Sequence, residues 1–445
     1  MPFIAPTRFA RAPPDSRPHA LLVVAGDLGR SPRMLYHAKA LAGQGYPVDL
    51  IGDGGSTLPA AVRDCPNLTV QVLPASAATG GANPLYLPRA AWRAAALATR
   101  LSDLLLRRLG RGDLLLVQNP PGVPVLAVAW AVARARRARF VIDWHNTTAA
   151  MLALRLSLRH PLVRAADALE RAVGRRADAN FFVSRTMADA LGSAGIRGTV
   201  FRDRPAEMFQ PLPADERATR RRDLLRRLGL PENCGLAVMP TSWTADDDLD
   251  LLFDALGRWE AHLDRATARP VALVGTGRGP FRARFEARAA ARAPSPIHLR
   301  TLWLEPEEYP RTLGCADVGL SLHRSASGLD LPMKAADLLG AGVPVLALDY
   351  GPCLHEQLRH GDNALLFAEA AEFARQLHAI FHGPADENPL AALAAGVARS
   401  RQTSWEEAWR DEAWPVLRSS GARSDVAAEG DDRGLVGRSA TWGRP

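Results

Sequence analysis

Small, cationic and acidic side chains are gathered in one short segment of the C-terminal half of the chain, Ser327–Asp337. Ser327 and Gly328 bring small side chains and unobstructed backbone N–H groups to the expected start of a helix, where anions are stabilised. Lys334 and Asp337 stand three residues apart, which makes them neighbours on one helical face. A cation suits phosphate and a carboxylate suits vicinal hydroxyls, so we predict a nucleoside-diphosphate site; a surface ion pair is the alternative. The residues assigned to this ligand are Ser327, Gly328, Leu329, Asp330, Lys334 and Asp337.

Two further loops of this half are candidates for the same site. Gly275–Pro280 follows an apolar run and precedes a helix, so its glycines can bring N–H groups close to a phosphate. Its spacing is not GxGxxG, and a plain turn explains the glycines equally well. In Thr241–Thr244, we assign Thr244 and the Asp residues after it to helix capping. The remaining candidates are Ser242 for phosphate, Trp243 for stacking on a ring, and Gly275, Gly277, Arg278 and Gly279 for phosphate.

Polar loops in the N-terminal half hold the residues that can move a proton. One loop runs from Asp27 to Ser31 and the other from Asp143 to Asn146, each directly after an apolar run. Asp27 or His145 is the candidate general base for a hydroxyl, although a lone histidine is more often a satisfied structural residue. The residues assigned to the molecule that carries this hydroxyl are Gly29, Arg30, Ser31, Arg33 and His37.

Apolar runs that alternate with helical patterns place these loops in a fold. Continuous apolar runs are typical of strands buried in a parallel sheet, and strands that alternate with helices indicate doubly wound α/β domains. Ligands of such domains bind beyond the carboxyl ends of the strands, where these loops lie. The expected strands are Leu21–Gly26, Pro47–Ile51, Leu68–Leu73, Asp113–Val117, Phe140–Asp143, Asn180–Val183, Leu236–Met239, Val271–Val274, Ile297–Thr301, Val318–Leu322 and Val343–Ala347.

The strand pattern stops and restarts, so we predict two Rossmann-like domains that face a central cleft. The segment 403–418 carries three Trp in an amphipathic pattern and is expected to pack across both domains. The predicted division is a flexible segment at 1–19, an N-terminal acceptor domain at 20–202, a linker at 203–215, a C-terminal donor-binding domain at 216–402, a crossing helix at 403–418 and a disordered tail at 419–445.

Composition excludes several classes of protein. The 445-residue chain has a net charge of +8, but its basic residues are nearly all Arg, and Lys occurs only at Lys39 and Lys334. Four scattered Cys lack disulfide or zinc spacing, so we expect no metal and a cytoplasmic, reducing compartment. No RNA- or DNA-binding motif is present. Neither a signal peptide nor an apolar run of spanning length occurs, so we expect any membrane contact to be peripheral.

Several strings of the sequence together resemble the chitobiosyldiphosphodolichol β-mannosyltransferase family. They occur in the family's order and are GDLGRSPRMLYHA, QNPPGVP, DWHN, TSWTADDD, GTGRGP and SASGLDLPMKAADLLGAGVPV. The resemblance as a whole covers roughly residues 20–418. The resemblance implies a GT-B fold, a GDP-mannose donor, no bound metal, and a lipid-diphosphate acceptor that carries two N-acetylglucosamines. Asp337 also resembles the ribose-contacting carboxylate of the large retaining GT-B family. Leu329 stands where that family has a second glutamate, which favours inversion.

The resemblance implies inversion and a β-1,4-mannosyl product, and our hypothesis for the mechanism is a single inverting displacement. Asp27 or His145 takes the proton of the acceptor hydroxyl. Lys334, Arg278 and the N–H groups of Ser327–Leu329 stabilise the departing GDP.

The acceptor is where the chain departs from the family. Thr147–Ala149 replaces an aromatic-glycine continuation of DWHN, and the Arg bias is typical of a GC-rich, bacterial genome. We expect Arg30 and Arg33 at the acceptor's diphosphate. We expect the basic amphipathic stretch Leu85–Arg111 at a membrane surface, with an ordinary outer helix as the alternative. Two other functions stay open: a GT-B transferase with another donor, such as UDP-glucose, and a soluble acceptor, or a catalytically silent nucleotide-sugar-binding protein.

Overall fold

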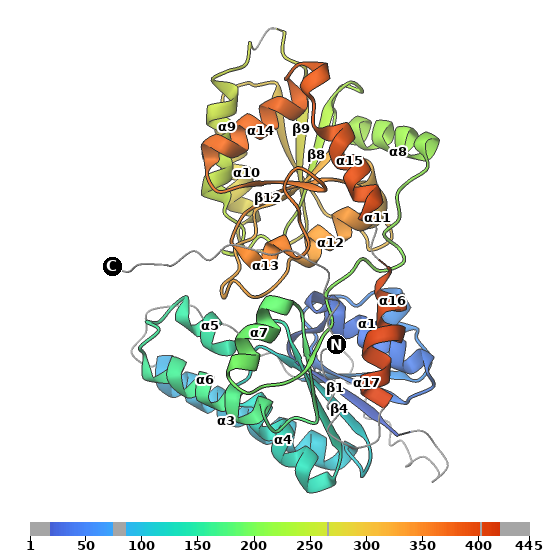
Figure 1. Ribbon diagram of the computed structural model, residues 1–445, viewed down its shortest axis with the longest axis vertical. Coiled ribbons are helices and arrows are strands. Elements are labelled where there is room, and N and C mark those ends of the chain that lie inside the picture. The colour runs from blue at the N-terminus through green and yellow to red at the C-terminus, as the bar shows by residue number, and fades with distance from the viewer. Residues whose placement is uncertain (1–17, 74–85, 265–266, 401–402, 419–445) are drawn as a thin grey trace, which may run out of the picture.

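The computed structural model describes residues 18–73, 86–264, 267–400 and 403–418. Apart from residues 18 and 19, the predicted flexible segment at 1–19 and the predicted tail at 419–445 lie outside this description. The described chain forms two α/β domains, one above the other in Figure 1, and each has helices on both faces of a parallel sheet. The predicted α/β class with two doubly wound domains is confirmed.

The N-terminal domain is built on a seven-stranded parallel sheet with the order β3-β2-β1-β4-β5-β6-β7. The strand order reverses between β1 and β4, and the loops beyond the carboxyl ends of such strands form the usual ligand crevice. The strands are β1 (Ala20–Asp27), β2 (Val48–Asp53), β3 (Leu68–Leu73), β4 (Leu114–Asn119), β5 (Arg139–Trp144), β6 (Ala179–Phe182) and β7 (Thr199–Val200). The helices are η1 (Leu28–Arg30), α1 (Pro32–Gly43), α2 (Ala60–Arg63), α3 (Tyr86–Arg108), α4 (Val125–Arg136), α5 (Thr148–Ala153), α6 (Pro161–Gly174) and α7 (Arg185–Ser193).

The C-terminal domain has a six-stranded parallel sheet with the order β10-β9-β8-β11-β12-β13. Its order reverses between β8 and β11, so its loops form a second crevice. The strands are β8 (Gly235–Pro240), β9 (Val271–Thr276), β10 (Ile297–Leu302), β11 (Val318–Ser321), β12 (Val345–Leu348) and β13 (Ala364–Phe367). The helices are α8 (Ala214–Arg227), α9 (Leu249–Glu260), α10 (Arg282–Ala290), α11 (Glu308–Gly314), α12 (Met333–Gly340), α13 (Pro352–His355), α14 (Ala370–Phe381), η2 (Ala385–Glu387) and α15 (Leu390–Arg399).

Both faces of each sheet are buried, which explains the continuous apolar runs of the sequence. In β1, Leu21 and Leu22 are both fully buried but point into different cores, because successive side chains of a strand face opposite sides. The short strands β7 and β13 were not predicted from sequence. A two-residue strand such as β7 is too short to give a periodic signal.

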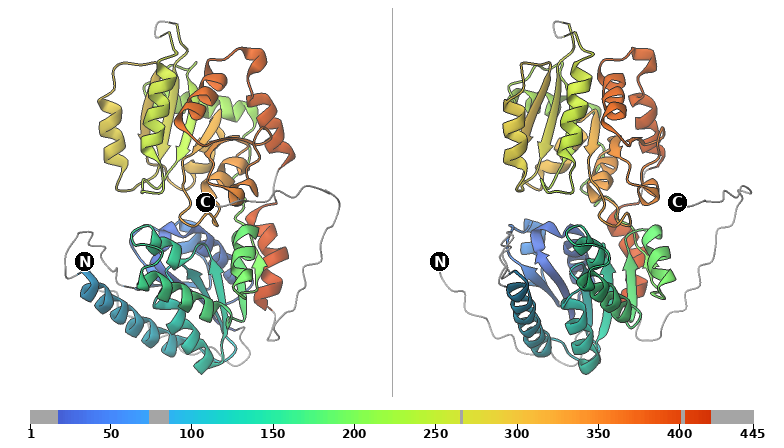
Figure 2. Two further views of the ribbon diagram at one scale, coloured as in Figure 1. Left: turned by 60° about the vertical axis from the view of Figure 1, so that its left-hand side comes forward. Right: turned by 90° about the vertical axis from the view of Figure 1, so that its left-hand side faces the viewer.

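The last helical segment returns to the N-terminal domain. It consists of α16 (Trp405–Ala408), the π-helical turn η3 (Trp409–Ala413) and α17 (Trp414–Arg418), and it lies beside α1 in Figure 1 and against the lower domain in Figure 2. Trp405 and Trp409 are buried in the core of the N-terminal domain rather than between two domains.

The stretch proposed for membrane contact forms the long helix α3. Leu101 and Leu105 in its C-terminal part, and Leu109 directly after it, are buried against the sheet, as in an ordinary outer helix. Trp92 near its start is 72% exposed. Within the described residues, no helix is long and apolar enough to cross a bilayer.

Candidate functional site

His145 lies in the loop between β5 and α5, at the carboxyl edge of the N-terminal sheet. Its Nε2 is 2.9 Å from Asp143 Oδ2, and its side chain is 23% exposed. Burial favours neutral Asp143, but Arg33 and His145 hold the pKa of this carboxyl well below its usual range. Because ionised Asp143 can only accept hydrogen bonds, a neutral His145 ring donates through Nε2–H and keeps a lone pair on Nδ1. This is the arrangement of an oriented general base.

A buried guanidinium holds Asp143 in place. Arg33 Nε and Nη2 donate to the two oxygens of Asp143 at 2.8 and 2.9 Å, and Nη1 donates to Asp203 Oδ1 at 2.9 Å. Arg33 also lies over the ring of Phe201, 4.6 Å from its centroid. Burial opposes its charge, but the two carboxylates raise the pKa of Arg33 above its usual value, so the side chain stays cationic.

The prediction that Arg33 and His37 present polar groups to the acceptor is wrong, because both side chains are buried. Arg33 is 1% exposed and His37 is fully buried. His37 accepts a hydrogen bond at Nδ1 from Trp409 Nε1 at 3.0 Å, and its Nε2 faces Asp143 at 3.4 Å. Burial lowers the pKa of His37. Both residues lie on the inward face of α1, where they support Asp143 instead of presenting polar groups to an acceptor.

Asp27 organises its own loop. Its carboxylate accepts hydrogen bonds from Gly29 N at 3.0 Å and from Ser56 N at 3.1 Å, and also from the Ser56 hydroxyl. Ser31 donates to the Asp27 carbonyl oxygen at 3.2 Å. Arg30 is the exposed residue of this loop: its Nη2 approaches the carbonyl oxygen of Arg278 in the other domain at 3.4 Å. Of the predicted acceptor residues in and after this loop, Arg30 is the cation that faces the opposite domain.

The loops of the two domains meet directly at their carboxyl edges. Asn146 Nδ2 donates to Asp330 Oδ1 at 2.9 Å, and Ser184 Oγ donates to the Leu329 carbonyl oxygen at 2.5 Å. Glu356 accepts from the backbone N–H groups of Arg185 and Thr186 at the start of α7, both at 2.8 Å. These contacts bring the predicted N-terminal and C-terminal loops to one place.

Asp330 is the centre of the loop that carries Ser327 and Gly328. Its carboxylate accepts from the Ser325 hydroxyl and lies 3.2 Å from His323 Nε2. Burial alone would raise the pKa of Asp330, but these partners lower it. Gly328 has a φ of 70°, which favours glycine. Asp330 therefore shapes this loop through hydrogen bonds that are made within the protein.

Lys334 and Asp337 do not form the ion pair that served as the alternative interpretation. Lys334 Nζ is 3.0 Å from Asp247 Oδ1, and Asp247 is almost fully buried. Asp337 Oδ2 instead accepts a hydrogen bond from the Tyr309 hydroxyl at 3.3 Å. Burial, with a smaller contribution from Asp203, raises the pKa of Asp337 to about 8. The two side chains therefore have separate surroundings.

Trp243 is a core residue, so the prediction that its indole is free to stack on a ligand is wrong. It is fully buried, packs on Phe285 with ring centroids 4.9 Å apart, and donates from Nε1 to the Gly277 carbonyl oxygen at 3.1 Å. A Cβ at Gly275 would lie 2.6 Å from this indole. Asp248, rather than Thr244, caps α9 by accepting from Leu251 N at 3.0 Å.

Close packing against the loop after β8 explains why glycines follow β9. A Cβ at Gly277 would lie 2.1 Å from the Thr241 carbonyl oxygen, and one at Gly279 would lie 1.9 Å from the Ser242 carbonyl oxygen. These glycines let the loops after β8 and β9 touch, which is a requirement independent of phosphate. Arg278 between them is exposed and stacks over Trp303, 3.8 Å from its centroid. Trp303 follows β10 at the same sheet edge and was not singled out from sequence.

Replacing Gly279 by Ala is expected to destabilise the C-terminal domain by about 1–3 kcal/mol, because the new methyl group would overlap a backbone carbonyl. The matched control is Gly257→Ala in α9, where no atom lies within 4 Å of the added Cβ. That substitution is expected to stabilise the helix by up to about 1 kcal/mol. Thermal unfolding of both variants measures these changes. If Gly279→Ala is as stable as Gly257→Ala, the two loops do not pack as described.

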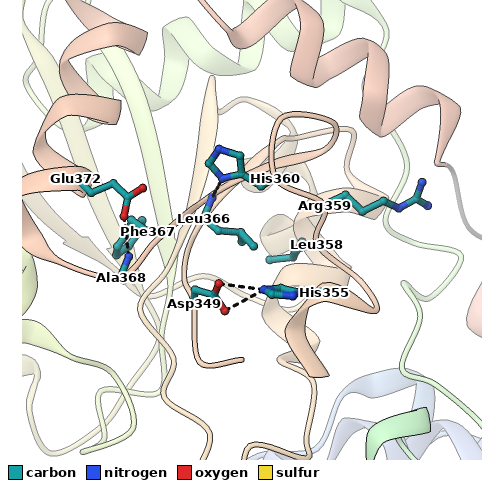
Figure 3. Close-up of a pocket in the computed structure, with 9 residues that line it drawn as sticks. All are labelled: Asp349, His355, Leu358, Arg359, His360, Leu366, Phe367, Ala368 and Glu372. Carbon is teal, nitrogen blue, oxygen red and sulfur yellow. Dashed lines mark hydrogen bonds and ion pairs between the residues drawn. The ribbon is translucent and has the colours of Figure 1, made fainter. Parts of the chain in front are cut away.

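A further cavity of about 370 Å³ lies beyond β12 and β13 (Figure 3). His355 Nε2 lies 3.1 and 3.0 Å from the two carboxylate oxygens of Asp349 at its edge. None of the predicted site residues lines this cavity.

Comparisons with known proteins agree with this geometry. A model of a glycosyl transferase 4-like domain matches residues 29–202, and a glycosyl transferase-like model matches residues 258–410. Anabaena HepE in complex with UDP and glucose superposes with a TM-score of 0.64 at 15% identity, covering 91% of this chain and 100% of that chain. The trehalose-phosphate synthase of Burkholderia vietnamiensis gives 0.62 at 14% identity, covering 90% and 100%. The fold and the facing loops define a GT-B glycosyltransferase.

Curated relatives narrow this class. The chitobiosyldiphosphodolichol β-mannosyltransferases of Mus musculus and Homo sapiens are 34% and 33% identical to this chain. Each alignment covers 90% of this chain, and it covers 89% of the mouse protein and 92% of the human protein. A UDP-glycosyltransferase of Arabidopsis thaliana named TURAN is 33% identical over 90% of this chain and 97% of its own. The chain belongs to the chitobiosyldiphosphodolichol β-mannosyltransferase family.

Proposed function

We propose that this enzyme transfers mannose from GDP-mannose to a lipid diphosphate that carries N-acetylglucosamine, with inversion. The observation that carries the proposal is the Asp143–His145 pair: an imidazole oriented by a buried carboxylate, partly exposed where the loops of the two domains meet. The names of the mouse and human relatives support the lipid-linked acceptor.

The mechanism is one displacement at the anomeric carbon. The acceptor oxygen forms the new bond, its proton moves to Nδ1 of His145, and the bond from the sugar to the diphosphate breaks. Inversion turns an α-linked donor into a β-linked product. Lys334 and Arg278 offset the charge that develops on the departing diphosphate, and Asp337 holds the ribose. Asp27 is left as the organiser of its loop, because its carboxylate already accepts hydrogen bonds from Gly29 and Ser56.

The two lysines of the chain offer a matched test of donor binding. Lys334→Ala is expected to raise the KM for the nucleotide sugar about tenfold or more, because a charge-assisted hydrogen bond contributes about 1.5–3 kcal/mol. Lys39→Ala, on the exposed face of α1, is expected to leave KM unchanged. Steady-state kinetics at varied donor concentration measures KM for both variants. Thermal unfolding of Lys334→Ala must accompany them, because this change also leaves buried Asp247 unpaired. An unchanged KM would remove Lys334 from the donor site.

A UDP-sugar donor is the second candidate, because TURAN is named a UDP-glycosyltransferase at similar identity. Competition between GDP-mannose and UDP-glucose for one lipid-linked acceptor decides between them. Transfer from GDP-mannose that excess UDP-glucose does not inhibit supports the first proposal. Transfer of hexose from UDP-glucose, with none from GDP-mannose, would show that the donor is a UDP-sugar.

A further inference from the structure

The surface formed by α5, α6 and the turn between them is apolar and exposed. Leu158 is 76% exposed, the largest fraction among the large apolar side chains of the described residues, and Leu154 is 59% exposed. Proteins seldom leave several such side chains together in water unless the surface binds something. We call this the α5–α6 surface, and its members are Met151, Leu154, Arg155, Leu158, Arg159, Leu162 and Arg164.

Positive charge accompanies the apolar side chains. Arg155, Arg159 and Arg164 are all exposed, and the sequence contains no Asp or Glu from residue 149 to residue 164. Exposed Leu with Arg and no carboxylate is the composition of a surface that lies in the interface of an anionic bilayer. A protein partner would more often be matched by charges of both signs and by side-chain hydrogen bonds.

The α5–α6 surface is fixed at its base. Glu170 of α6 is buried and accepts from the backbone N–H groups of Thr148 at 2.6 Å and Ala149 at 3.3 Å, at the start of α5. Asn119 Nδ2 donates to the same carboxylate at 2.7 Å. The two helices are therefore joined rigidly to the sheet, while the outer side chains of the surface remain open.

The position of this surface ties it to the reaction. α5 begins at Thr148, directly after the turn that carries His145, and Thr147 caps it by accepting from Ala150 N at 3.2 Å. In Figure 1, α5 lies at the edge of the N-terminal domain that faces the C-terminal domain. A bilayer in contact with α5 would present the head group of an embedded lipid close to His145.

We propose that the α5–α6 surface docks this enzyme on an anionic lipid bilayer, so that a lipid-linked acceptor reaches His145 without leaving the membrane. The proposal rests on the proposed function, since only a lipid-linked acceptor requires such docking. It replaces α3 as the membrane-contacting element, because the C-terminal part of α3 packs on the sheet.

Cosedimentation of the full-length protein with vesicles tests the proposal. The probes are vesicles of phosphatidylcholine alone and of phosphatidylcholine mixed with phosphatidylglycerol. The test variants are Leu154→Gln with Leu158→Gln, and Arg155→Glu with Arg159→Glu. The matched controls on α3 are Trp92→Gln with Leu106→Gln, and Arg89→Glu with Arg100→Glu, all at exposed positions.

The wild type is expected to bind the anionic vesicles more tightly than the neutral ones and to lose this preference at high salt. Each α5–α6 variant should lower the partition coefficient about tenfold or more, and each α3 variant should change it less than about threefold. All these side chains are exposed, so thermal unfolding should be unaltered. Absence of a preference for anionic vesicles, or an equal loss in the α3 variants, would overturn the proposal.

Failure of docking and failure of the proposed function give different results. Vesicle binding is measured without donor or acceptor, so it does not depend on turnover. Transfer to a short-chain acceptor that is soluble in water measures the chemistry alone and should be unaffected in the Leu154/Leu158 variant. If this transfer occurs but vesicle binding does not, the transferase assignment stands and the docking surface is excluded.

Discussion

Replacing His145 by Ala is expected to lower kcat for sugar transfer by about a hundredfold or more, because the acceptor hydroxyl loses its proton acceptor. The effect should fall on kcat more than on the KM for the donor, since His145 belongs to the N-terminal loop. Stability should change little, because Arg33 still holds both oxygens of Asp143. Steady-state kinetics with a thermal unfolding control measures these quantities.

Asp27→Asn is the comparison that separates the two base candidates. The amide keeps one acceptor oxygen for the N–H groups of Gly29 and Ser56, so the loop is expected to persist with a much smaller loss of kcat than in His145→Ala. If Asp27→Asn abolishes turnover while His145→Ala does not, the roles given to these residues are reversed.

Replacing Arg33 by Met is expected to destabilise the N-terminal domain by about 3–5 kcal/mol, because it leaves the buried carboxylates of Asp143 and Asp203 without their cation. Arg30→Met is the matched control. Its side chain is 50% exposed and its pair with Asp27 is long, at 3.7 Å, so a change within about 0.5 kcal/mol is expected. Urea unfolding, followed by tryptophan fluorescence, measures both variants.

The loss of folding stability in Arg33→Met should depend on pH in a defined direction. The pKa of Asp143 is depressed in the folded protein, so its ionised form stabilises the fold above the unfolded pKa of about 3.9. This contribution disappears as the pH falls through the lower, folded pKa. The difference between wild type and Arg33→Met should therefore be largest near neutral pH and shrink in acid. A difference that stays constant with pH would show that Asp143 is not the group involved.

Much of the fold follows from the sequence because burial on both faces of a parallel sheet leaves a simple signal. Continuous apolar runs predicted the long strands, and the polar loops after them were expected at one edge. The contact of Asn146 with Asp330 shows that loops from both domains do meet there.

Partners distant in sequence could not be predicted. Arg33 and His37 lie one turn apart on α1, and their spacing does not reveal that their inward face meets Asp143, 110 residues beyond Arg33. Helical periodicity relates only near neighbours, so from sequence Lys334 was compared with Asp337. The actual partner of Lys334 is Asp247, which belongs to another loop. Trp243 looked available because it stands among polar residues; only the packing of Gly275 and Phe285 shows that it is buried.

The central claim is inverting sugar transfer with His145 as the base. The most direct measurement incubates the wild type and His145→Ala with GDP-mannose and a lipid diphosphate bearing two N-acetylglucosamines, and then determines the anomeric configuration of the product by NMR. We predict one added mannose in β linkage from the wild type and almost none from His145→Ala. An α-linked product, or equal amounts of product from both proteins, would contradict the account.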